Sequence, residues 1–595
     1  MNSAPKKPHD IGDGFTCASY LDDGHWLAIA RPHAKHGMVE LTGAAEFDES
    51  CRGDQHAVRR YRQSLTTAES AFLTPSAPTG TTVVARGVDD DGSIWMRVRV
   101  ESSGGSPTSF SLTFEGWLQR PPYAEITDTA PLPPISRETS ISARGNRLLL
   151  SSATTESTAE IVVEAESISS SGWMLGREGV AHWDGEWPPV EHGGEGGEFV
   201  VRCRLDTPGD PPYSPKGISA EHELRPGEAG SFSAIARGAR SYILECCALR
   251  VAPEETVIIT DHRLLPLSWT RDAYYMALLL LLSGGDDAIA AAARHLRWLW
   301  GSARRDGAWM RSHLTNGTVK DPGIQADQQL YPILELLDYR RAVGSWPALP
   351  AGELDWGVLV RAALEALPSD PVTGLLMSEE NPADDISGFD LSFSTQVLYW
   401  HVLENLAVWN AELSLDDDTP GVVADELRTT IREVFTVDGP DGTVFAYEAD
   451  GRGEYRLYGD ANDLPSVLAP AWGFCDDDDP VWRRTMRFIL SPSNPGWSPG
   501  TFGGLGSAHT PGTWPLGDLQ AYIFHDRIGE ADDARKVRER LVLMAADDGL
   551  LPEAYDSATG EWSARHWFGW PAAAVGCLAF SPSLAVPVSH HGETP

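Results

Sequence analysis

Cysteine is scarce in this sequence, and its placement argues against two kinds of cross-linked protein. The chain holds 7 cysteines in 595 residues, an odd number, and none of them forms a CxxC pair. Neither a disulfide framework nor a structural zinc site is therefore expected. We interpret the thiols as reduced, buried side chains of a cytoplasmic protein. They are Cys17, Cys51, Cys203, Cys246, Cys247, Cys475 and Cys577.

Positive charge is also in short supply. Lysine and arginine number 47 against 85 aspartates and glutamates, which gives a formal net charge of −38. Nucleic-acid binding needs clustered basic side chains to neutralise phosphates, so neither nucleic acid nor another polyanion is expected as a partner. An acidic surface keeps a chain soluble and says little more about its function.

Long apolar runs and metal-binding motifs are absent as well. The longest apolar run, Ala277–Leu282, is too short to cross a bilayer, so no membrane partner is expected. Residues 1–14 contain Lys6 and Lys7 but no apolar stretch after them, and we expect no signal peptide. HExxH, EF-hand and Cys/His-cluster patterns do not occur, so we predict no metal and no other cofactor.

What the sequence does contain is typical of a large folded protein. Hydrophobic residues make up 42% of it, with 21 tryptophans and 57 glycines, unlike a disordered chain. A chain of 595 residues exceeds one ordinary core, so two or three domains are expected. Tryptophan-rich clefts often bind carbohydrate, although core filling is the alternative use for most of these side chains.

The N-terminal region has the pattern of a β protein. Short β-branched or alternating segments are separated by Gly, Ser, Pro and Asp clusters, which predicts a two-sheet β-sandwich over residues 1–235. Clear examples are residues 82–85, 95–100, 147–150, 160–163 and 199–203. Residues 236–262, punctuated by Ala252-Pro253-Glu254-Glu255, are predicted to be a linker. We find no catalytic constellation in this half.

Beyond residue 261 the apolar spacing becomes helical. About eleven helices are expected, at 272–283, 286–300, 326–342, 355–367, 393–412, 421–435, 465–473, 480–490, 515–528, 530–546 and 567–580. A toroid of six inner and six outer helices needs about twelve, so we predict an (α/α)6 barrel over residues 263–582. The fold class is thus multidomain β + α, with residues 583–595 as a frayed tail.

A polar cluster stands just before the most apolar of these helices. Trp269, Arg271 and Asp272 combine an aromatic face with fixed donors and acceptors, a set that can grip a sugar ring and its hydroxyls. The alternative is a helix cap, in which Asp272 caps the helix and Arg271 pairs with it.

Two further loops carry the carboxyl groups that glycosidic hydrolysis needs, one to donate a proton and one to activate water. Residues 379–385 hold adjacent acids, which oppose each other's ionisation, so that one is more easily kept protonated. Glu553 is a lone acid followed by an aromatic-rich segment that contains Arg565. The alternatives are a solvated acidic loop and a plain turn between helices.

A glycine-rich loop at residues 503–510 contains His509 and precedes Trp514. It lacks the Walker spacing and does not lie in a βαβ unit, so phosphate or dinucleotide binding is not expected. We interpret it as a ligand loop in which His509 is a hydroxyl partner. A flexible loop without a ligand is the alternative.

Seven of these pieces, in the same order, resemble motifs of glycoside hydrolase family 125, the inverting exo-α-1,6-mannosidases with a helical-barrel catalytic domain. They are Trp269–Ala273, Ala326–Pro332, Pro382–Asp385, Asp460–Asn462 with Pro465-Ser466, Gly506–Thr510 with Trp514-Pro515, Pro552–Ala554 and Arg565–Trp570. A second resemblance, to the glucoamylase family 15, covers both halves. It is carried by Ile11–Gly14, Arg31-Pro32, Trp269–Asp272 and Leu550–Asp556.

The two resemblances imply the same division of roles. Glu553 corresponds to the general base, and the general acid falls in the Pro-Ala-Asp-Asp loop. There we prefer Asp385 over Asp384 and place Glu379 and Glu380 third. The residues implied in substrate binding are Trp269, Arg271, Asp272, Asp327, His509, Trp514, Arg565 and Trp567.

We therefore predict an exo-acting, inverting α-glycosidase, most like an α-mannosidase, with an oligosaccharide or glycoside as its partner. Tyr274–Met276 replace a glutamine-bearing helix of family 125, and Pro552–Ala554 replace its His-Glu-Ser motif, so the identity of the sugar stays open. The alternatives are a glucoamylase-like α-glucosidase, a sugar phosphorylase or epimerase, and a non-catalytic carbohydrate-binding protein. The sequence does not predict the oligomeric state.

Overall fold

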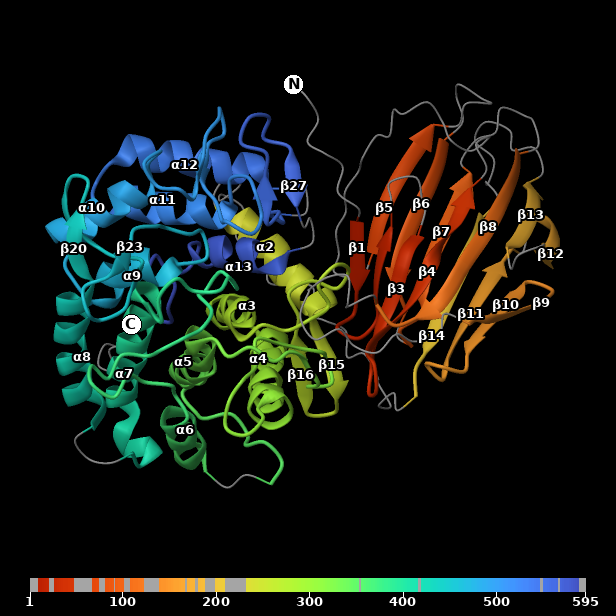
Figure 1. Cartoon of the computed structure of the whole chain (residues 1–595). Helices are drawn as coiled ribbons and strands as arrows, with labels where there is room; N and C mark the ends of the chain where they lie inside the picture. Colours follow the sequence, from red (N-terminus) through yellow and green to blue (C-terminus); the bar gives the residue numbers. More distant parts are fainter. Residues whose placement is uncertain are drawn as a thin grey trace, which may run out of the picture.

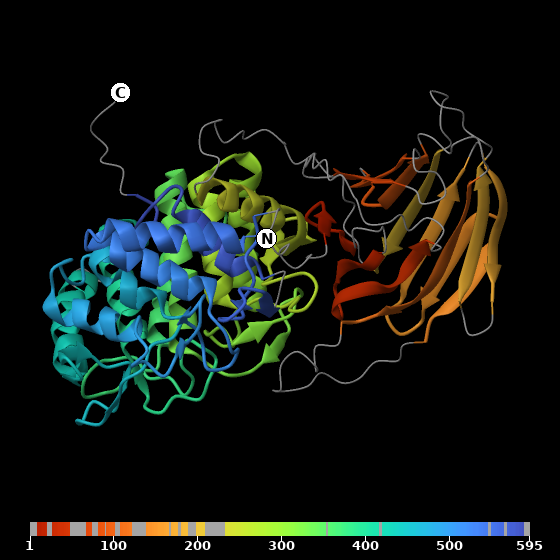
Figure 2. The ribbon, with the colours of Figure 1, turned by 90° about the horizontal axis from the view of Figure 1, so that it is seen from above.

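The computed structural model combines an N-terminal β-rich part with a C-terminal helical part (Figure 1). Figure 2, seen from above, shows the same two parts side by side. The residues that the structure describes are 9–20, 26–47, 67–73, 81–89, 91–100, 108–121, 138–165, 168–176, 180–187, 198–208, 232–352, 355–415, 419–545, 549–564 and 568–587.

The β-rich part holds two seven-stranded sheets in which neighbouring strands pair antiparallel. The first has the order β1 (His9–Gly12), β2 (Cys17–Tyr20), β3 (Trp26–His33), β4 (Gly37–Phe47), β8 (Thr108–Gln119), β13 (Ala181–Trp187), β12 (Ser169–Leu175). The second has the order β5 (Thr67–Leu73), β6 (Thr81–Val88), β7 (Ile94–Val100), β14 (Glu198–Asp206), β11 (Ser157–Glu164), β10 (Arg147–Ser152), β9 (Ser140–Arg144). The prediction of a β-rich N-terminal region is confirmed.

One hydrophobic core joins the two sheets. Leu112 and Trp183 from the first sheet belong to the same buried cluster as Met96, Ile161 and Val201 from the second. Strand β10 shows the pattern behind this arrangement, because its residues alternate strictly between exposed and buried positions. Alternation of this kind places one face of each sheet inside and the other in solvent.

Residues 236–262 are not a linker, which corrects the prediction for this segment. They hold most of α2 (Phe232–Tyr242), a π-helical turn η3 (Ile243–Cys247), β15 (Ala248–Ala252) and β16 (Glu255–Ile258). Ala252-Pro253-Glu254-Glu255 is the turn between β15 and β16, where Ala252 pairs with Glu255. The flanking apolar residues belong to the main core of the helical part. Their apolar character therefore reflects burial in that core and not a role as a spacer between domains.

Each of the eleven expected helices is present in the described residues, with ends that differ from the prediction by a few residues. They are α3 (Thr270–Ser283), α4 (Asp286–Trp298), α5 (Ala326–Val343), α6 (Trp356–Glu365), α7 (Phe393–Leu413), α8 (Thr419–Phe435), α9 (Leu464–Trp472), α10 (Pro480–Ile489), α11 (Pro515–Arg527), α12 (Ala531–Met544) and α13 (Gly569–Cys577). A π-helical turn, η4 (Leu299–Ala303), extends α4.

Short strand pairs fill the loops between the helices. They are β17 (Ser312–His313) with β18 (Val319–Asp321), β19 (Leu391–Ser392) with β22 (Glu448–Ala449) and β23 (Tyr455–Arg456), β20 (Thr436–Gly439) with β21 (Gly442–Phe445), β24 (Trp497–Ser498) with β25 (Gly504–Leu505), and β26 (Ala554–Tyr555) with β27 (Trp562–Ala564). These pairs brace the long loops on which the polar motifs lie.

Alternate helices pack on one another in a fixed succession. Helix α3 packs on α5, α5 on α7, α7 on α9, α9 on α11, α11 on α13, and α13 returns to α3. Further helices lie against this set, with α2 on α13, α4 on α3, α6 and α8 on α7, and α12 on α11. The motif segments come just before or at the first turns of the helices in the succession, so they gather at one end of it.

The first residues of the predicted frayed tail are ordered against the helical part. Leu584 is fully buried, and the carbonyl oxygen of Ser583 accepts a hydrogen bond from the indole of Trp472 at 3.1 Å. Residues 588–595 lie outside the described part of the chain. The first residues of the expected tail are therefore packed against the helical part.

Direct contacts join the two parts of the molecule. His262 lies 2.8 Å from the hydroxyl of Ser19 in β2 through Nε2, and 3.0 Å from the hydroxyl of Tyr242 through Nδ1. The Thr315 hydroxyl donates to the carbonyl oxygen of Gly37 at the start of β4. The β-rich part is thus bonded to the helical part through buried polar groups.

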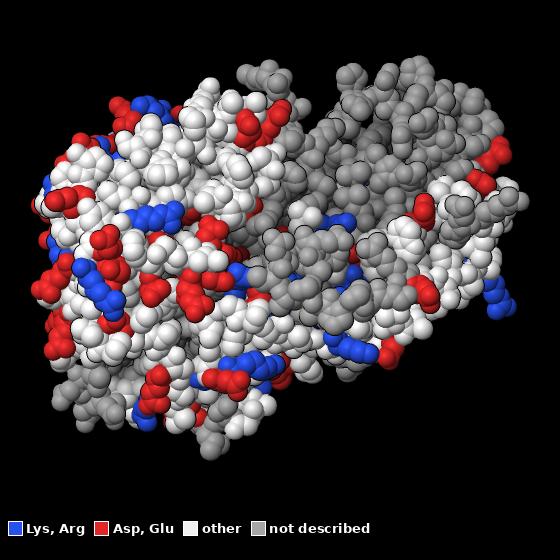
Figure 3. Space-filling view, viewed as in Figure 1, with Lys and Arg blue, Asp and Glu red and all other residues white. Residues whose placement is uncertain are grey.

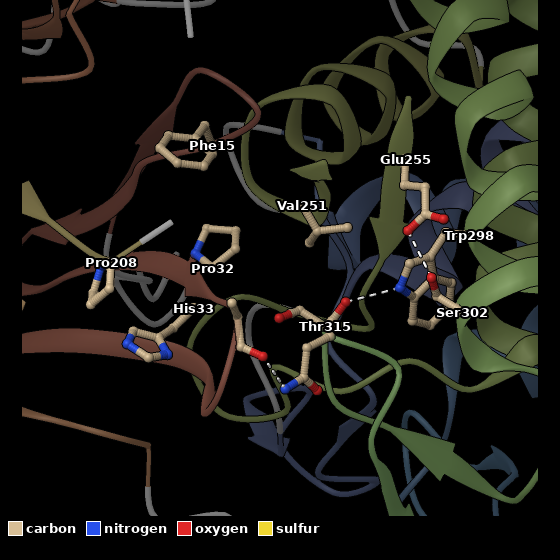
Figure 4. A pocket seen from close by; sticks show the side chains of 11 residues that line it. Phe15, Pro32, His33, Pro208, Val251, Glu255, Trp298, Ser302 and Thr315 are labelled. Carbon is tan, nitrogen blue, oxygen red and sulfur yellow. Dashed lines mark hydrogen bonds between the residues drawn. The ribbon is translucent and has the colours of Figure 1, made fainter. Parts of the chain in front are cut away.

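A cavity of about 230 Å³ lies along this junction (Figure 4). Phe15 and His33 face it from the sheets, and Trp298, Ser302 and Glu255 from the helical part. Ser302 donates to Glu255 at 2.8 Å, so the polar groups here bind one another. Among its described lining residues Glu255 is the single carboxylate, which does not match the two carboxyls of a hydrolytic site.

Surface and core features bear on two further expectations. Six of the cysteines fall in the described segments, and each is a buried free thiol, whereas Cys51 lies outside those segments. None of the helices in the described segments is both long and apolar enough to span a membrane. On the face seen in Figure 3, acidic side chains are spread over the helical part with basic ones among them.

Candidate active site

The predicted site residues meet in a pocket at the end of the helical part where the motif segments gather. Its lining residues are separated by up to about 300 positions in the sequence but adjacent in space. They are Leu265, Trp269, Arg271, Asp272, Ala383, Asp384, Asn462, His509, Trp514, Glu553, Phe568 and Trp570. Seven of the predicted residues are therefore together, namely Trp269, Arg271, Asp272, Asp384, His509, Trp514 and Glu553.

The start of α3 forms the floor of this pocket. Trp269 occupies the N-cap position in an extended conformation, and its side chain makes no capping hydrogen bond. Thr270 is tied to the start of α5, because its hydroxyl donates to the carbonyl oxygen of Gln328 at 2.7 Å. Asp272 lies inside the first turn and accepts from the hydroxyl of Thr260 at 2.8 Å. The alternative of Asp272 as a helix cap is therefore wrong.

Arg271 is a buried guanidinium that holds several acceptors in place. It donates from Nη1 to Asp327 Oδ2 and from Nη2 to Asp384 Oδ1, each at 2.9 Å. A longer hydrogen bond of 3.3 Å runs from Nη1 to the side chain of Gln325. Asp327, predicted to line the pocket, is not among its lining residues and instead anchors Arg271.

Asp272 is a pocket-lining carboxyl with a raised pKa. Burial raises the pKa of Asp272 to about 7, although the charge of Arg271 and the hydrogen bond from Thr260 oppose this. Near neutral pH the group therefore exchanges between its acid and carboxylate forms. A carboxylate accepts hydrogen bonds from sugar hydroxyls, whereas the acid form can also donate one.

The two acids of the Pro-Ala-Asp-Asp loop have different surroundings. Asp384 lines the pocket, has a left-handed backbone with a φ of 64°, and accepts from the Gln325 side chain at 2.6 Å as well as from Arg271. Asp385 is half-buried and is not among the lining residues. Its backbone N–H donates to the side chain of Asn381 at 3.2 Å, which anchors the loop.

Electrostatics favours Asp385 as the group that keeps a proton. Burial raises the pKa of Asp385, and the charges of Asp460 and Asp384 act in the same direction, while His509 and Arg456 oppose them. Asp384 instead accepts a hydrogen bond from the guanidinium of Arg271. Position in the pocket therefore favours Asp384 as the general acid, whereas the raised pKa favours Asp385.

Glu380, which with Glu379 was the third choice for the general acid, is bonded to residues that hold the pocket lining. It accepts from Arg311 Nη1 at 3.0 Å and from the side chain of Gln325 at 3.1 Å. Gln325 thereby connects Glu380 to Asp384. Neither Glu379 nor Glu380 is among the lining residues.

Glu553 lines the same pocket from the loop before β26, and only 1% of it is exposed. Its backbone N–H donates to the carbonyl oxygen of Ala564 at 3.2 Å, which ties the loop to β27. His509 Nε2 lies 3.8 Å from Glu553 Oε1, an ion-pair distance. The indole of Trp514, the N-cap residue of α11, meets the His509 ring edge-on, with ring centroids 5.1 Å apart.

Some site residues fall outside the prediction, and two predicted ones fall outside the described residues. Asn462, Phe568 and Trp570 line the pocket without having been predicted, although their motif segments carried the signal. Gln325, the N-cap residue of α5, had no signal in the sequence. Arg565 and Trp567 lie in a segment that the structure does not describe, so their roles stay predictions.

One group with metal-binding spacing occurs in the described residues, away from the residues that line the pocket. It consists of His525, Glu530 and Asp533, around the turn between α11 and α12. Glu530 is already paired with Arg487 at 2.6 Å, and Asp533 with Lys536 at 2.7 Å. These cations neutralise the acids that a metal ion would need, so we assign no metal to the group.

Residues 362–580 match the family model described as metal-independent alpha-mannosidase (GH125). The matched segment contains both carboxyl loops, His509 and Trp514. The resemblance to glycoside hydrolase family 125 is therefore confirmed over this segment, and the match supports a glycoside hydrolase.

Comparison with individual proteins agrees with this match. The Meiotically up-regulated gene 157 protein of Schizosaccharomyces pombe is 33% identical over 155 residues, which are 25% of this chain and 30% of that protein. The aligned part thus spans less than a third of the length of that relative.

One solved structure supports the fold. A Streptococcus pneumoniae member of a family of metal-independent alpha mannosidases, in a non-productive complex with alpha-1,6-mannobiose, is 18% identical, covering 59% of this chain and 94% of that chain with a TM-score of 0.50. A glucoamylase from Saccharomycopsis fibuligera is also a structural neighbour, at 13% identity, 58% and 93% coverage and a TM-score of 0.43. At 18% identity the first likeness concerns the fold.

Proposed function

We propose that this protein is an exo-acting, inverting α-glycosidase that removes a terminal sugar, most like an α-mannosidase. The observation that carries the proposal is the pocket in which Glu553 and the Asp384–Asp385 loop meet, within the segment that matches the mannosidase family model. Two carboxyl groups at one pocket are what glycosidic hydrolysis requires.

The architecture that we propose for this function is a β-sandwich followed by an (α/α)6 barrel. The shared core of the two sheets supports the sandwich. The succession α3, α5, α7, α9, α11, α13 and back to α3 supports an inner ring of six helices. Helix α2, which packs on α13, supplies the outer helix that brings the total to twelve.

In the proposed reaction Asp385 acts as the general acid and protonates the glycosidic oxygen, with Asp384 as the second candidate. Glu553 takes a proton from a water molecule on the opposite face of the sugar, and that water attacks the anomeric carbon. Inverting enzymes need the two carboxyls about 6.5–9.5 Å apart to leave room for the water. The product then has the β configuration.

We propose that the remaining pocket residues recognise the terminal sugar. Asp272 accepts from its hydroxyls, Trp269 and Trp570 offer apolar faces, and Arg271 keeps Asp384 in place. The mannobiose in the Streptococcus pneumoniae complex favours an α-linked mannose as that sugar. The partner is then a mannose-terminated oligosaccharide or glycoside.

A cytoplasmic location and catalysis without a cofactor complete the proposal. The six described cysteines are free thiols, which supports a reducing compartment. The pocket is lined by carboxyl, guanidinium, imidazole, amide and aromatic groups, a set that suffices for acid–base hydrolysis.

The decisive experiment is a panel of aryl α-mannosides, α-glucosides and α-linked oligosaccharides, with proton NMR of the first-formed sugar. We expect release of terminal mannose in the β configuration, and loss of that activity by at least about a hundredfold in Glu553→Gln and Asp385→Asn, because each removes a proton-transfer group. A first product in the α configuration contradicts inversion.

The same panel separates the alternative functions. Preference for α-glucosides would identify a glucoamylase-like enzyme, and dependence on phosphate would identify a phosphorylase. Turnover of free sugar without hydrolysis would indicate an epimerase. Sugar binding that is intact in Glu553→Gln, with no hydrolysis in the parent, would indicate a carbohydrate-binding protein.

A further inference from the structure

A chain of hydrogen bonds, called the relay below, runs from the buried Asp460 through Ser507 to His509, which lines the pocket. Asp460 is fully buried, and its Oδ1 accepts from the backbone N–H and the side-chain amide of Asn462 at 3.0 and 2.9 Å. Its Oδ2 accepts from the Tyr458 hydroxyl at 3.0 Å and from the Ser507 hydroxyl at 2.9 Å. These hydrogen bonds fix Asp460 in position as an acceptor.

Asp460 sets the direction of the next hydrogen bond. Because a carboxylate only accepts, the single hydroxyl proton of Ser507 points to Asp460. Ser507 Oγ lies 3.0 Å from Nδ1 of His509, and with its own proton engaged it accepts from that nitrogen. His509 therefore carries a proton on Nδ1, and its Nε2 is the nitrogen that faces Glu553.

The charges around His509 favour its doubly protonated form. The acids that act on it are Glu553, Asp460, Asp384 and Asp385. Burial lowers the pKa of His509, but the interaction with Glu553 and the charges of Asp460 and Asp384 outweigh burial and raise it. An imidazolium placed in this way directs Nε2–H toward Glu553 Oε1, 3.8 Å away.

We propose that Asp460 and Ser507 are positioning residues, which hold the His509 imidazolium against Glu553 and thereby orient the Glu553 carboxyl toward the attacking water. The proposal rests on the proposed base role of Glu553. It gives His509 a task other than that of hydroxyl partner to the sugar. In the reaction His509 keeps its proton, and the proton of the water ends on Glu553.

The kinetic test removes one hydroxyl from the relay. In Ser507→Ala the Nδ1 proton loses its acceptor, so we expect kcat to fall about tenfold while KM stays within about twofold. Ser507→Thr keeps the hydroxyl and is expected to recover most of the rate. Ser557→Ala is the matched control, because the Ser557 hydroxyl is partly exposed and donates to the carbonyl oxygen of Pro499, at 2.9 Å.

A second measurement tests the relay without any substrate. Nitrogen-15 NMR of the histidine side chains, with the His509 signals identified by their loss in His509→Gln, reports which ring nitrogen carries a proton. We expect a proton on Nδ1 of His509 near neutral pH in the parent and in Ser507→Thr. In Ser507→Ala we expect that proton to exchange faster and the pKa of His509 to fall.

Two results would overturn the proposal. One is a parent His509 whose Nδ1 carries no proton near neutral pH, and the other is a Ser507→Ala protein with unchanged kcat and unchanged His509 signals. The NMR result stands even if no α-glycoside is hydrolysed. Failure of the relay is therefore distinguishable from failure of the glycosidase proposal.

Discussion

At the scale of single residues, buried charge organises the pocket. Arg271 is 2% exposed, so its guanidinium is stable there only because acidic groups compensate it, and Asp327 and Asp384 do so at 2.9 Å each. The planar fork of an arginine can hold two carboxylates in two directions, which a lysine ammonium does not reproduce. Arg271 thus links the start of α5 to the Pro-Ala-Asp-Asp loop.

Asp272 gives a pH-dependent prediction at this scale. Its pKa is raised to about 7 in the folded protein by burial, against an ordinary value of 3.8. The folded state therefore binds the proton more tightly, so the stabilisation is fully present below about pH 4 and is lost as the pH rises through about 7. We expect Asp272→Asn to flatten the decline of the unfolding free energy over this range by up to about 1.4 kcal/mol per pH unit.

The measurement is urea unfolding of parent and variant at several pH values between 4 and 8. Asp556→Asn serves as the control, because Asp556 is an exposed acid whose pKa is lowered by hydrogen bonds of its turn. Parallel stability curves for the parent and Asp272→Asn would contradict the prediction.

At the scale of elements, the pocket and the residues that support it lie at the N-termini of several helices. Trp269 precedes α3, Gln325 precedes α5, Trp514 precedes α11, and Phe568 precedes α13, each as the N-cap residue. Helix N-termini carry partial positive charge and unpaired N–H groups, which favours acids at this end. The helix starts therefore support both the carboxyl groups and a polar ligand.

The contact between α2 and α13 gives a prediction for one glycine. A Cβ added at Gly576 would lie 2.8 Å from the Cα of Ala236, closer than packed atoms allow. We expect Gly576→Ala to lower the free energy of unfolding by about 1–3 kcal/mol, because one of the two helices must move. Chemical denaturation measures the change.

Gly421→Ala in α8 is the matched control for this substitution. Its added Cβ would meet only the Ala407 side chain, at 3.6 Å, which is an ordinary contact. A glycine in a helix costs about 0.5–1 kcal/mol relative to alanine, so this variant should be unchanged or slightly stabilised. Equal effects of the two substitutions would refute the close approach of α2 and α13.

At the scale of the whole molecule, buried polar contacts make the β-rich and helical parts depend on each other. His262 is 5% exposed and joins Ser19 of β2 to Tyr242 of α2, while the acid Asp10 lies 3.3 Å from its Nε2. A hydrogen-bonded histidine in this position couples the unfolding of one part to that of the other.

We expect His262→Ala to lower the stability by about 1–3 kcal/mol, because it removes the buried hydrogen bonds of His262 to the hydroxyls of Ser19 and Tyr242. Differential scanning calorimetry should then show a broader or divided transition, since the β-rich part loses a contact that couples it to the helices. His182→Ala, which removes a 3.2 Å contact with Thr113 inside one sheet, is the control. A single sharp transition of unchanged midpoint in His262→Ala would disprove the coupling.

The sequence by itself determined the local elements and the motif set. Eleven helices were predicted because a helix with one buried face has apolar residues at three- and four-residue spacing. Strand segments were predicted because a strand with one buried face alternates between apolar and polar residues. Trp269, Arg271, Asp272, Asp384, His509, Trp514 and Glu553 were all predicted, and the structure brings them into one pocket. Short-range patterns of this kind need no knowledge of distant residues.

Only the tertiary structure decided which surfaces meet. Residues 252–255 have the composition of a linker, but they form the turn of a hairpin, and the segment before them is a helix that packs on α13. Asp327 was expected to line the pocket, but it is not among the lining residues and is paired with the guanidinium of Arg271. Apolar spacing reports that a face is buried and not what buries it, so contacts between distant segments come from the fold alone.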